Sequence, residues 1–413
     1  MNLISISWKN LRHRPLNTLL SLTLFATGTG LISLVLLLNH QIQQQFDRNM
    51  AGIDLVIGAK GSPLQLILSS MYHLDSPTGN IPLSEARPFL RPGHPMIARA
   101  VPLSLGDGYR GWRIVGTDTA FLALYGLELA SGRLWEKPME VVAGSEVARA
   151  LGLEPGSRFK SAHGLADEAF LTHEEAPDFV VVGILAPSGT VADNLLLTDT
   201  RSVWVVHDTQ HDHHTHDTLP AAWQQPLYQI EDQAITAILL QFKGRNYQTL
   251  NMARQINENT NLLAASPPVE LSKVYLQVGR GVQLMQYVAW VIIALSALSV
   301  FIALYQSLQE RRYELALMRV MGAAPRTLAA LILSEGLLMA CLGTLLGLLL
   351  SHGGMLALRT LVADVWRFRF DAFALLPQEA WLLLGAIATG IVAALVPAWQ
   401  AGRTEIAETL TEK

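Results

Sequence analysis

The residues best suited to metal chemistry lie in one short run, HDTQHDHHTHD, at positions 207–217. This run holds five of the twelve histidines of the chain, together with three aspartates. Neutral imidazole is a common ligand of zinc, so the composition is that of a zinc-binding loop. The candidate zinc ligands are His207, His211, His213, His214 and His216.

Two interpretations of this run stay open. A folded structural zinc site normally takes its ligands from separated positions on rigid elements. The run instead follows an expected strand at 202–206 and has the composition of a flexible loop. It is therefore either a solvated polar loop or a loop that binds zinc weakly. His163 and His173 lie in a second acidic stretch, but nothing in the sequence brings them close to the run.

Phosphate chemistry is not encoded by the glycine-containing segment GAKGSPLQLILSS at 58–70. A phosphate-binding loop needs G-x-x-x-x-G-K-[ST], which aims backbone N–H groups and a lysine at the phosphates. Here Lys60 precedes Gly61, and G-K-[ST] occurs nowhere in the sequence. We expect a turn followed by an apolar helix, and no catalytic constellation, cofactor or ATP site in this chain.

Composition indicates that part of the chain lies in lipid. Half of its 413 residues are hydrophobic, 15% are charged, and the mean hydropathy is +0.29, whereas soluble domains have about 25% charged residues. The net charge of −4 gives no sign of a nucleic-acid partner. The single cysteine, Cys341, excludes a disulfide within the chain.

Four segments reach the length of about 18 apolar residues that can cross a bilayer. They are residues 16–38, 285–308, 327–350 and 380–400. The apolar part of the first segment is longer than that of a cleaved signal peptide, so we interpret it as a retained anchor.

Lysine and arginine near the spans predict the orientation, because cytoplasmic flanks are enriched in these residues. They cluster in the segments 1–15, 309–326 and 401–413, which are expected in the cytoplasm together with both termini. The segment 39–284 and the loop 351–379 are then expected on the outside.

The segment 39–284 is long enough to form one or two domains. It contains strand-like runs punctuated by Gly, Pro and Asp, and helical stretches at 145–152 and 247–260. The strand-like runs are 54–58, 112–117, 179–185, 202–207 and 235–242. This mixture predicts an α+β domain, and the polar ends of the segment predict two helices that continue the first and second spans as a stalk.

Small and polar residues mark the third span. Gly336, Gly343 and Gly347 are expected to allow close helix packing. Glu335 is the one acid clearly inside a span, and we expect it to be hydrated or to hydrogen-bond a Ser or Thr of a neighbouring helix.

The charged segment between the second and third spans has the pattern of a short amphipathic helix. On a helical wheel, Tyr313, Leu317, Val320 and Met321 fall within an arc of about 100°. This apolar face is expected to rest on the bilayer or the span ends, leaving the arginines and Leu315 pointing into the cytoplasm. Gly322 and Pro325 are expected to end the helix.

The same segment carries a family resemblance. Its residues match the pattern E-R-x-x-E-[IL]-x-x-x-[RK]-x-x-G-A, which joins spans two and three in the MacB/FtsX superfamily of ABC transporters. The matching positions are Glu310, Arg311, Glu314, Leu315, Arg319, Gly322 and Ala323. The tail VPAWQAGRTEIAETL resembles the ending of this family, although it lacks a proline often found before the final A-x-x-L. SWKNLRHRPLNTLLS and FVVVGILAPSGTVADN are similar to its first span and outer domain.

The resemblance implies a permease subunit of a bacterial inner-membrane ABC transporter that is not itself an enzyme. ATP and Mg²⁺ would be bound by a separate ATPase subunit, which the 309–326 segment would contact as a coupling helix. The coupling residues would be Glu310, Arg311, Arg312, Glu314, Leu315, Arg319 and Gly322. A second permease chain, membrane lipids and a periplasmic or outer-membrane protein would be its other partners. The rival hypotheses are a zinc-handling permease that uses the 207–216 loop and a scaffold or sensor without transport.

Overall fold

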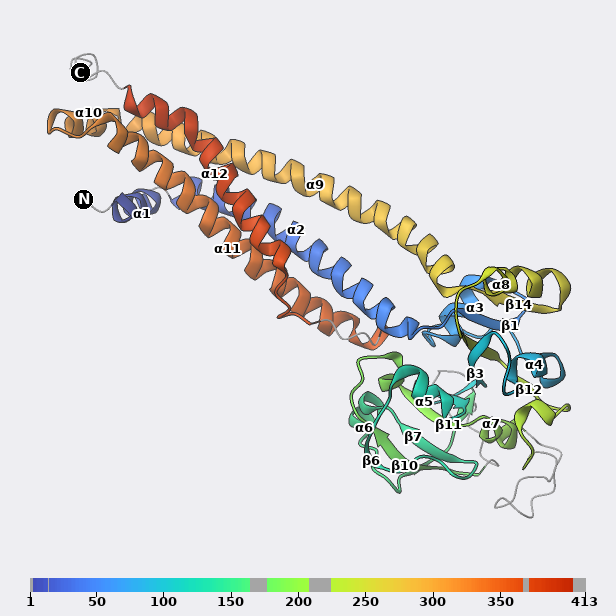
Figure 1. Cartoon of the computed structure of the whole chain (residues 1–413). Helices are drawn as coiled ribbons and strands as arrows, with labels where there is room; N and C mark the ends of the chain where they lie inside the picture. The colour runs from blue at the N-terminus through green and yellow to red at the C-terminus, as the bar shows by residue number, and fades with distance from the viewer. Residues whose placement is uncertain (1–2, 14, 164–176, 208–223, 367–370, 404–413) are drawn as a thin grey trace. The chain divides into compact units, whose positions relative to one another are not determined.

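The computed structural model describes residues 3–13, 15–163, 177–207, 224–366 and 371–403. The chain forms two compact units. The helical unit comprises residues up to Gln43 and from Gln277 onward, and the outer unit comprises Gln44–Leu276. Each unit is described by itself below, with the labels of Figure 1.

Among the residues that the structure describes, six helices build the helical unit or pass into it (Figure 1). They are α1 Leu3–His13, α2 Pro15–Met50, α9 Pro267–Glu310, α10 Arg312–Val320, α11 Pro325–Trp366 and α12 Pro377–Gly402. Among the described residues, α2, α9, α11 and α12 are long and apolar enough to cross a membrane. The polar segments that continue the first and second spans are helical, because α2 and α9 run through them without a break.

The helix that contains the predicted third span continues beyond it. Helix α11 continues to Trp366, whereas the sequence predicted a loop from residue 351 onward. The extra turns are held by α2, because Ser351 accepts a hydrogen bond from Ser33 at 2.9 Å and Met355 packs in one cluster with Leu37. Tertiary contacts, which hydropathy does not register, therefore lengthen the helix.

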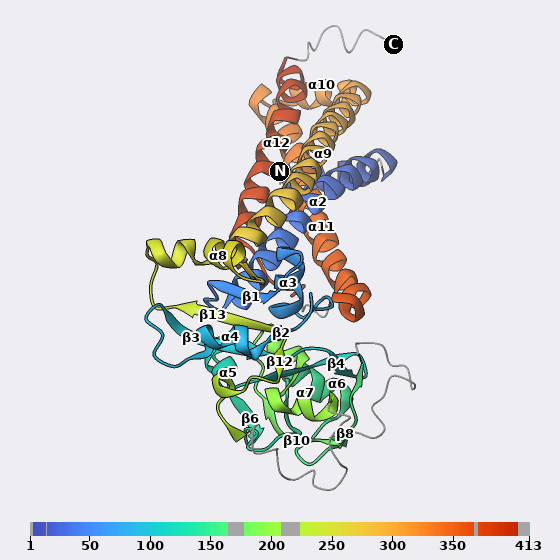
Figure 2. The ribbon, with the colours of Figure 1, turned by 90° about the vertical axis from the view of Figure 1, so that its right-hand side faces the viewer.

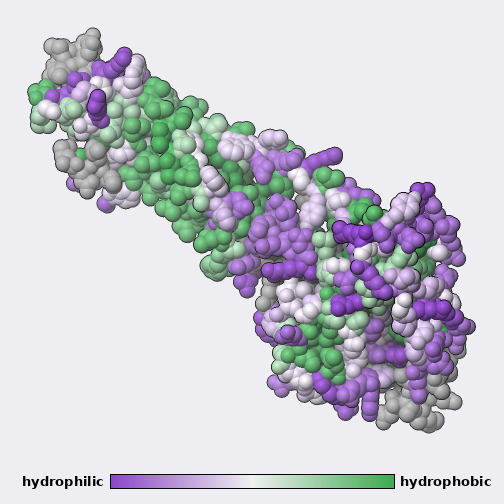
Figure 3. Space-filling view, in the orientation of Figure 1, coloured by the Kyte–Doolittle hydropathy of each residue, from purple (hydrophilic) through white to green (hydrophobic). Residues whose placement is uncertain are grey.

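Apolar side chains cover the outside of the helical unit. Figure 3 shows this surface as a green band over the long helices, with purple residues at the end that carries α10. The exposed side chains of α9 include Leu284, Trp290, Val291, Leu295 and Leu298. Because few soluble proteins expose such a large apolar surface, lipid is the solvent that suits it.

The outer unit mixes strands with short helices (Figure 2). Its helices are α3 Pro63–Ser70, α4 Leu83–Leu90, α5 Ala120–Tyr125, α6 Ser145–Leu151, α7 Thr200–His207 and α8 Tyr247–Asn259. Its strands are β1 Leu55–Ala59, β2 Ile81–Pro82, β3 Ile97–Leu103, β4 Asp107–Tyr109, β5 Trp112–Thr117, β6 Leu129–Gly132, β7 Glu140–Ala143, β8 Arg158–Phe159, β9 Ala162–His163, β10 Phe179–Leu185, β11 Leu195–Asp199, β12 Ala234–Ile235, β13 Ala237–Phe242 and β14 Leu262–Ala265.

These strands form an antiparallel four-stranded sheet, an eight-stranded mixed sheet and a small β12–β2 pair. The first has the order β14-β1-β13-β3, and the second runs β6-β10-β7-β11-β5-β4-β9 with β8 beside β10. Buried side chains from both sheets, including Val56, Leu103, Val115 and Leu197, share one hydrophobic cluster. The domain is therefore α+β, as the sequence predicted.

The apolar helix predicted after the glycine-containing turn is confirmed as α3. Ser62 precedes it and accepts a hydrogen bond from the Gln65 backbone at 3.5 Å, and Pro63 occupies the first turn. Proline suits this position because its missing N–H has no partner in the helix there.

The strand predicted at 202–207 is wrong, because these residues form the helix α7. The valines and the tryptophan favour a strand by propensity, but that preference is weak. Asp199 caps the helix by accepting the Arg201 N–H at 2.8 Å. Ser202 then lies within hydrogen-bond distance of the Met139 N–H and of the Thr198 hydroxyl. A cap and buried polar contacts thus outweigh the local preference.

Candidate functional site

The charged segment between α9 and α11 folds as the separate short helix α10. Arg311 interrupts the path from α9, since its backbone leaves the helical region with φ −105° and ψ 13°. Gly322 ends α10 with φ +99°, a conformation that glycine adopts without the cost a side chain would add. Its N–H donates to the Arg319 carbonyl at 3.0 Å. Both ends of α10 are therefore fixed by backbone geometry.

Leu315 of α10 is buried, whereas the sequence predicted that it points into the cytoplasm. Leu315 is 2% exposed and Ala316 is fully buried, so the side that was expected to face the cytoplasm packs on the helical bundle. The four residues of the apolar arc are exposed in the structure: Tyr313 by 50%, Leu317 by 40%, Val320 by 58% and Met321 by 78%. Amphipathic periodicity gives two faces, but it does not say which of them the bundle covers.

Two arginines of the segment turn toward the bundle. Arg311 lies with Nη1 3.6 Å from Oε1 of Glu335, and its Nε donates to Glu314 at 3.0 Å. Arg319 donates to the carbonyl oxygen of Gly402 at 3.4 Å, at the end of α12. These guanidinium groups hold α10 against α11 and α12, while Arg312 is exposed.

Glu335 is buried in α11, with 2% of the residue exposed. Its described partners differ from the expected Ser or Thr. The side-chain amide of Asn10 donates a hydrogen bond to Oε1, and the Arg311 guanidinium approaches the same oxygen. The carboxylate thus lies between α1 and the start of α10.

Sequence reasoning missed Ser7 and Asn10 of α1. The Ser7 hydroxyl lies 2.7 Å from that of Ser334, and Asn10 reaches the neighbouring Glu335. The available signal was their spacing of three, which places both polar side chains on one face of a helix. In the third span, the consecutive polar residues Ser334 and Glu335 were the matching signal for a partner of this face.

The glycines of the third span lie at helix contacts. A Cβ on Gly336 would approach Ala394 of α12 to 2.8 Å, and one on Gly343 would approach Phe25 of α2 to 2.8 Å. Gly347 lies against Gly30, since a Cβ on Gly30 would meet its carbonyl oxygen at 2.8 Å. Absence of side chains at these positions lets the backbones approach closely.

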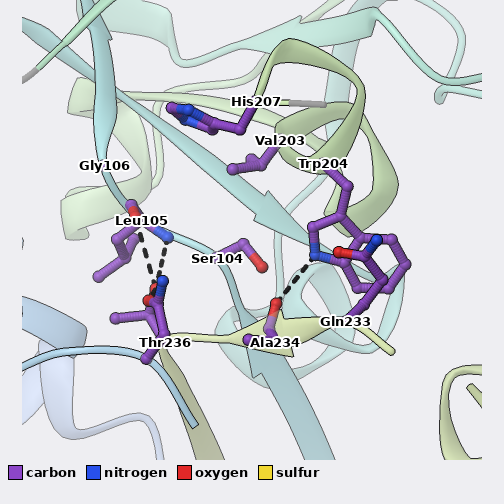
Figure 4. A pocket seen from close by; sticks show the side chains of 10 residues that line it. Ser104, Leu105, Gly106, Val203, Trp204, His207, Gln233, Ala234 and Thr236 are labelled. Atoms are coloured by element: carbon purple, nitrogen blue, oxygen red, sulfur yellow. Dashed lines mark hydrogen bonds between the residues drawn. The ribbon is translucent and has the colours of Figure 1, made fainter. Parts of the chain in front are cut away.

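A cavity of about 430 Å³ opens in the outer unit beside α7 (Figure 4). The Trp204 ring lies at one end, and its indole N–H donates to the Ala234 carbonyl at 2.9 Å. Ser104 and Thr236 supply hydroxyl groups, and the Thr236 oxygen accepts from the Leu105 N–H at 2.9 Å. The cavity is lined by Asn80, Ser104, Leu105, Gly106, Val203, Trp204, His207, Gln233, Ala234 and Thr236.

His207 is the one residue of the histidine run that the structure describes, since residues 208–223 lie outside the described ranges. Its Nε2 lies 3.2 Å from the buried carboxylate of Asp107. A hydrogen bond with this carboxylate raises the pKa of His207 above its ordinary value. Among described side chains, no group of three or more His, Cys, Asp or Glu is placed to hold a metal. The zinc hypothesis stays a prediction.

Among the described residues, four long apolar helices, an α+β domain between the first and second of them in the sequence, and a short charged helix before the third form the arrangement of a membrane protein. Comparison with family models agrees. The MacB-like periplasmic core domain matches residues 18–267, well over half of the chain, and the FtsX-like permease C-terminal domain matches residues 287–406. The chain belongs to the MacB/FtsX-like family of ABC transporter permeases.

Two solved structures resemble parts of this chain. One is the periplasmic region of MacB from Actinobacillus actinomycetemcomitans, at 12% identity and a TM-score of 0.34, covering 55% of this chain and 95% of that one. The other is the extracellular domain of the noncanonic ABC-type transporter YknZ from Gram-positive bacteria, at 11% identity and a TM-score of 0.29, covering 52% and 99%. A comparison with curated protein sequences gave no match.

Proposed function

We propose that this chain is a permease subunit that couples ATP hydrolysis by a separate ABC ATPase to movement of its outer domain. The proposal places α10 and both termini in the cytoplasm and the outer unit in the periplasm of a bacterial inner membrane. A second permease chain completes the transporter. The family membership and the exposed apolar face of α10 support this function.

The exposed face of α10 has the chemistry of a docking surface. Tyr313, Leu317 and Met321 succeed one another at intervals of four residues, which aligns them along one side of the helix. An amphipathic helix can bind by laying such a stripe into a hydrophobic groove. Aromatic and aliphatic anchors usually supply most of the energy of such contacts. We therefore assign the contact with the ATPase to this stripe, with Arg312 at its flank.

The arginines that turn inward act as supports in this proposal. Arg311 and Arg319 tie α10 to α11 and α12, so a force applied to the stripe reaches the bundle instead of bending a loop. Leu315 has the same role through packing, since it belongs to the buried cluster that also contains Leu304, Leu308 and Leu328.

The test is to replace Leu317 with Glu and to co-purify the full chain with the ABC ATPase subunit that this proposal requires. Loss of an apolar anchor should lower the affinity for the ATPase at least tenfold, about 1.4 kcal/mol. Leu250→Glu, which changes a leucine that is 72% exposed on α8, is the matched control and should bind the ATPase normally. Binding of the Leu317→Glu variant at wild-type affinity would contradict the assigned face.

The same experiment separates the rival hypotheses. A scaffold or sensor would not depend on an ATPase, so the wild-type chain would then retain no ATPase partner on purification. A zinc-handling permease would still bind the ATPase through α10, and would differ only in zinc binding by the histidine run.

A further inference from the structure

We propose that Glu335 is a positioning residue that joins the coupling helix α10 to the N-terminal helix α1, so that both helices move together when α10 is displaced. This inference rests on the proposed function, because it concerns how a force that enters at α10 is passed on. It assigns α1 a part in coupling, which neither its sequence nor the family match assigns.

The first support is the junction at Arg311. This residue lies between Glu310, where α9 ends, and Arg312, where α10 begins, and its backbone is not helical. A break between two helices is where one of them can pivot. The guanidinium at this break reaches Glu314 within α10 and Glu335 within α11. A pivot of α10 therefore changes the Arg311–Glu335 contact directly.

The second support is the contact of the same carboxylate with α1. Oε1 of Glu335 accepts the Asn10 amide, and the adjacent Ser334 hydroxyl lies 2.7 Å from Ser7. Two polar contacts from one face of α1 fix both its position along α11 and its rotation. Because the carboxylate is buried, leaving it without Arg311 is costly, and it is expected to follow the guanidinium.

The third support is the connection from α1 to α2. The Thr18 hydroxyl donates to the carbonyl of Leu11 at 3.0 Å across the short link between the two helices. Displacement of α1 is thereby passed to α2, one of the two helices that continue without a break into the outer unit. A displacement of α10 would therefore reach both α11 and α1 through Glu335.

The experiment measures ATP hydrolysis by the complete complex in lipid nanodiscs, together with ATPase binding. Glu335→Gln keeps the size of the side chain and an oxygen for Asn10, but removes the charge that faces Arg311. We expect normal ATPase binding and about a tenfold lower kcat for ATP hydrolysis, with KM for ATP unchanged. Thr389→Val, which removes an exposed hydroxyl from α12, is the control and should stay within twofold of wild type.

A double-mutant cycle tests whether Arg311 and Glu335 act through their mutual contact or independently of each other. Arg311→Gln combined with Glu335→Gln should be no worse than the more damaging single variant. Kcat within twofold of wild type for Glu335→Gln would overturn the proposal, as would additive losses in the cycle. Loss of ATPase binding by Glu335→Gln would also overturn it, because the residue would then only maintain the fold of α10.

A second variant covers the case in which Glu335→Gln does not reach the membrane. Asn10→Ala leaves Glu335 and Arg311 in place and removes only the hydrogen bond from α1 to Glu335, while the Ser7–Ser334 contact stays. It should bind the ATPase normally and lower kcat, and unchanged kcat would overturn the proposal. Failure of the proposed function is distinguishable, because the wild-type chain itself would then bind no ATPase.

Discussion

At the scale of single residues, His73 has the environment least like that of a histidine in water. It follows α3 with φ +54°, and both ring nitrogens are buried without a hydrogen-bond partner among the described residues. Burial, and to a lesser extent the Arg113 guanidinium, lowers the pKa of His73 to about 3. The imidazole is therefore neutral in the folded protein at physiological pH.

This pKa predicts acid sensitivity of the outer unit. The unfolded chain binds a proton below about pH 6.5 and the folded chain does not, so stability falls as pH decreases from about 6.5 toward 3. At pH 5 the loss is about 2 kcal/mol. Hydrogen exchange of β1 and β13 in the full chain measures it. His73→Asn, which tolerates a positive φ, should remove this part of the pH dependence, and an unchanged slope would refute the assignment.

At the scale of elements, two glycines of α11, Gly347 and Gly353, differ in how closely another helix approaches them. A Cβ on Gly347 of α11 would lie 2.8 Å from the Ala26 carbonyl oxygen and 2.9 Å from the Gly30 nitrogen of α2. Gly353 lies further along the same helix, and no described atom comes within 4 Å of the corresponding position. Gly347 therefore lies at a contact between helices and Gly353 does not, a difference that the sequence does not show.

This difference predicts opposite effects of one substitution. Gly347→Ala should destabilise the helical unit by about 1–3 kcal/mol, because the methyl group overpacks the contact with α2. Gly353→Ala should stabilise it by about 0.5–1 kcal/mol, because alanine favours the helix. Denaturant unfolding of the purified chain in detergent measures both changes. Equal effects of the two substitutions would show that α11 does not pack on α2 in this way.

At the scale of the whole molecule, the helices α2 and α9 are each longer than the hydrocarbon core of a bilayer is thick. Helix α2 has 36 residues and α9 has 44, which correspond to about 54 and 66 Å at 1.5 Å per residue. A hydrocarbon core is about 30 Å thick. Both helices can therefore cross the membrane and continue beyond it as the helical connection that the proposed coupling needs.

Membrane insertion in the proposed orientation predicts the sides on which single cysteines are labelled. In a Cys341→Ser background, an impermeant maleimide should label Glu128→Cys in intact spheroplasts. It should label Met321→Cys, a position that is 78% exposed on the α10 side, only after permeabilisation. Labelling of both positions from the same side would be incompatible with the proposed topology and with the coupling function.

Much of the architecture was predictable because it depends on composition, periodicity and turn residues within short stretches of the sequence. The strands at 112–117 and 179–185 and the helices α6 and α8 were found from composition and turn residues. The termination at Gly322 followed from the need for a positive φ. The helix α7 was missed because an aspartate cap and the contacts of Ser202 outweighed its β-branched residues.

The position of the candidate site in the sequence was predictable, but which side chains of α10 are buried was not. The pattern from Glu310 to Ala323 located the helix and suggested the family, to which the chain belongs. The burial of Leu315 was the reverse of the expectation. Both sides of α10 contain side chains able to pack, so only the neighbouring helices select the face that is covered.

The amino-acid sequence alone determined the four apolar helices, the α+β class of the inserted domain and the helical nature of the segment between the second and third spans. Each of these depends on composition or periodicity within a short stretch of chain. The tertiary structure alone decided that α11 extends to Trp366, that Arg311 and Arg319 turn inward, and that Asn10 and Arg311 meet at Glu335. These contacts join residues on different helices, with Asn10 and Glu335 lying 325 positions apart, and their formation depends on the packing of whole helices.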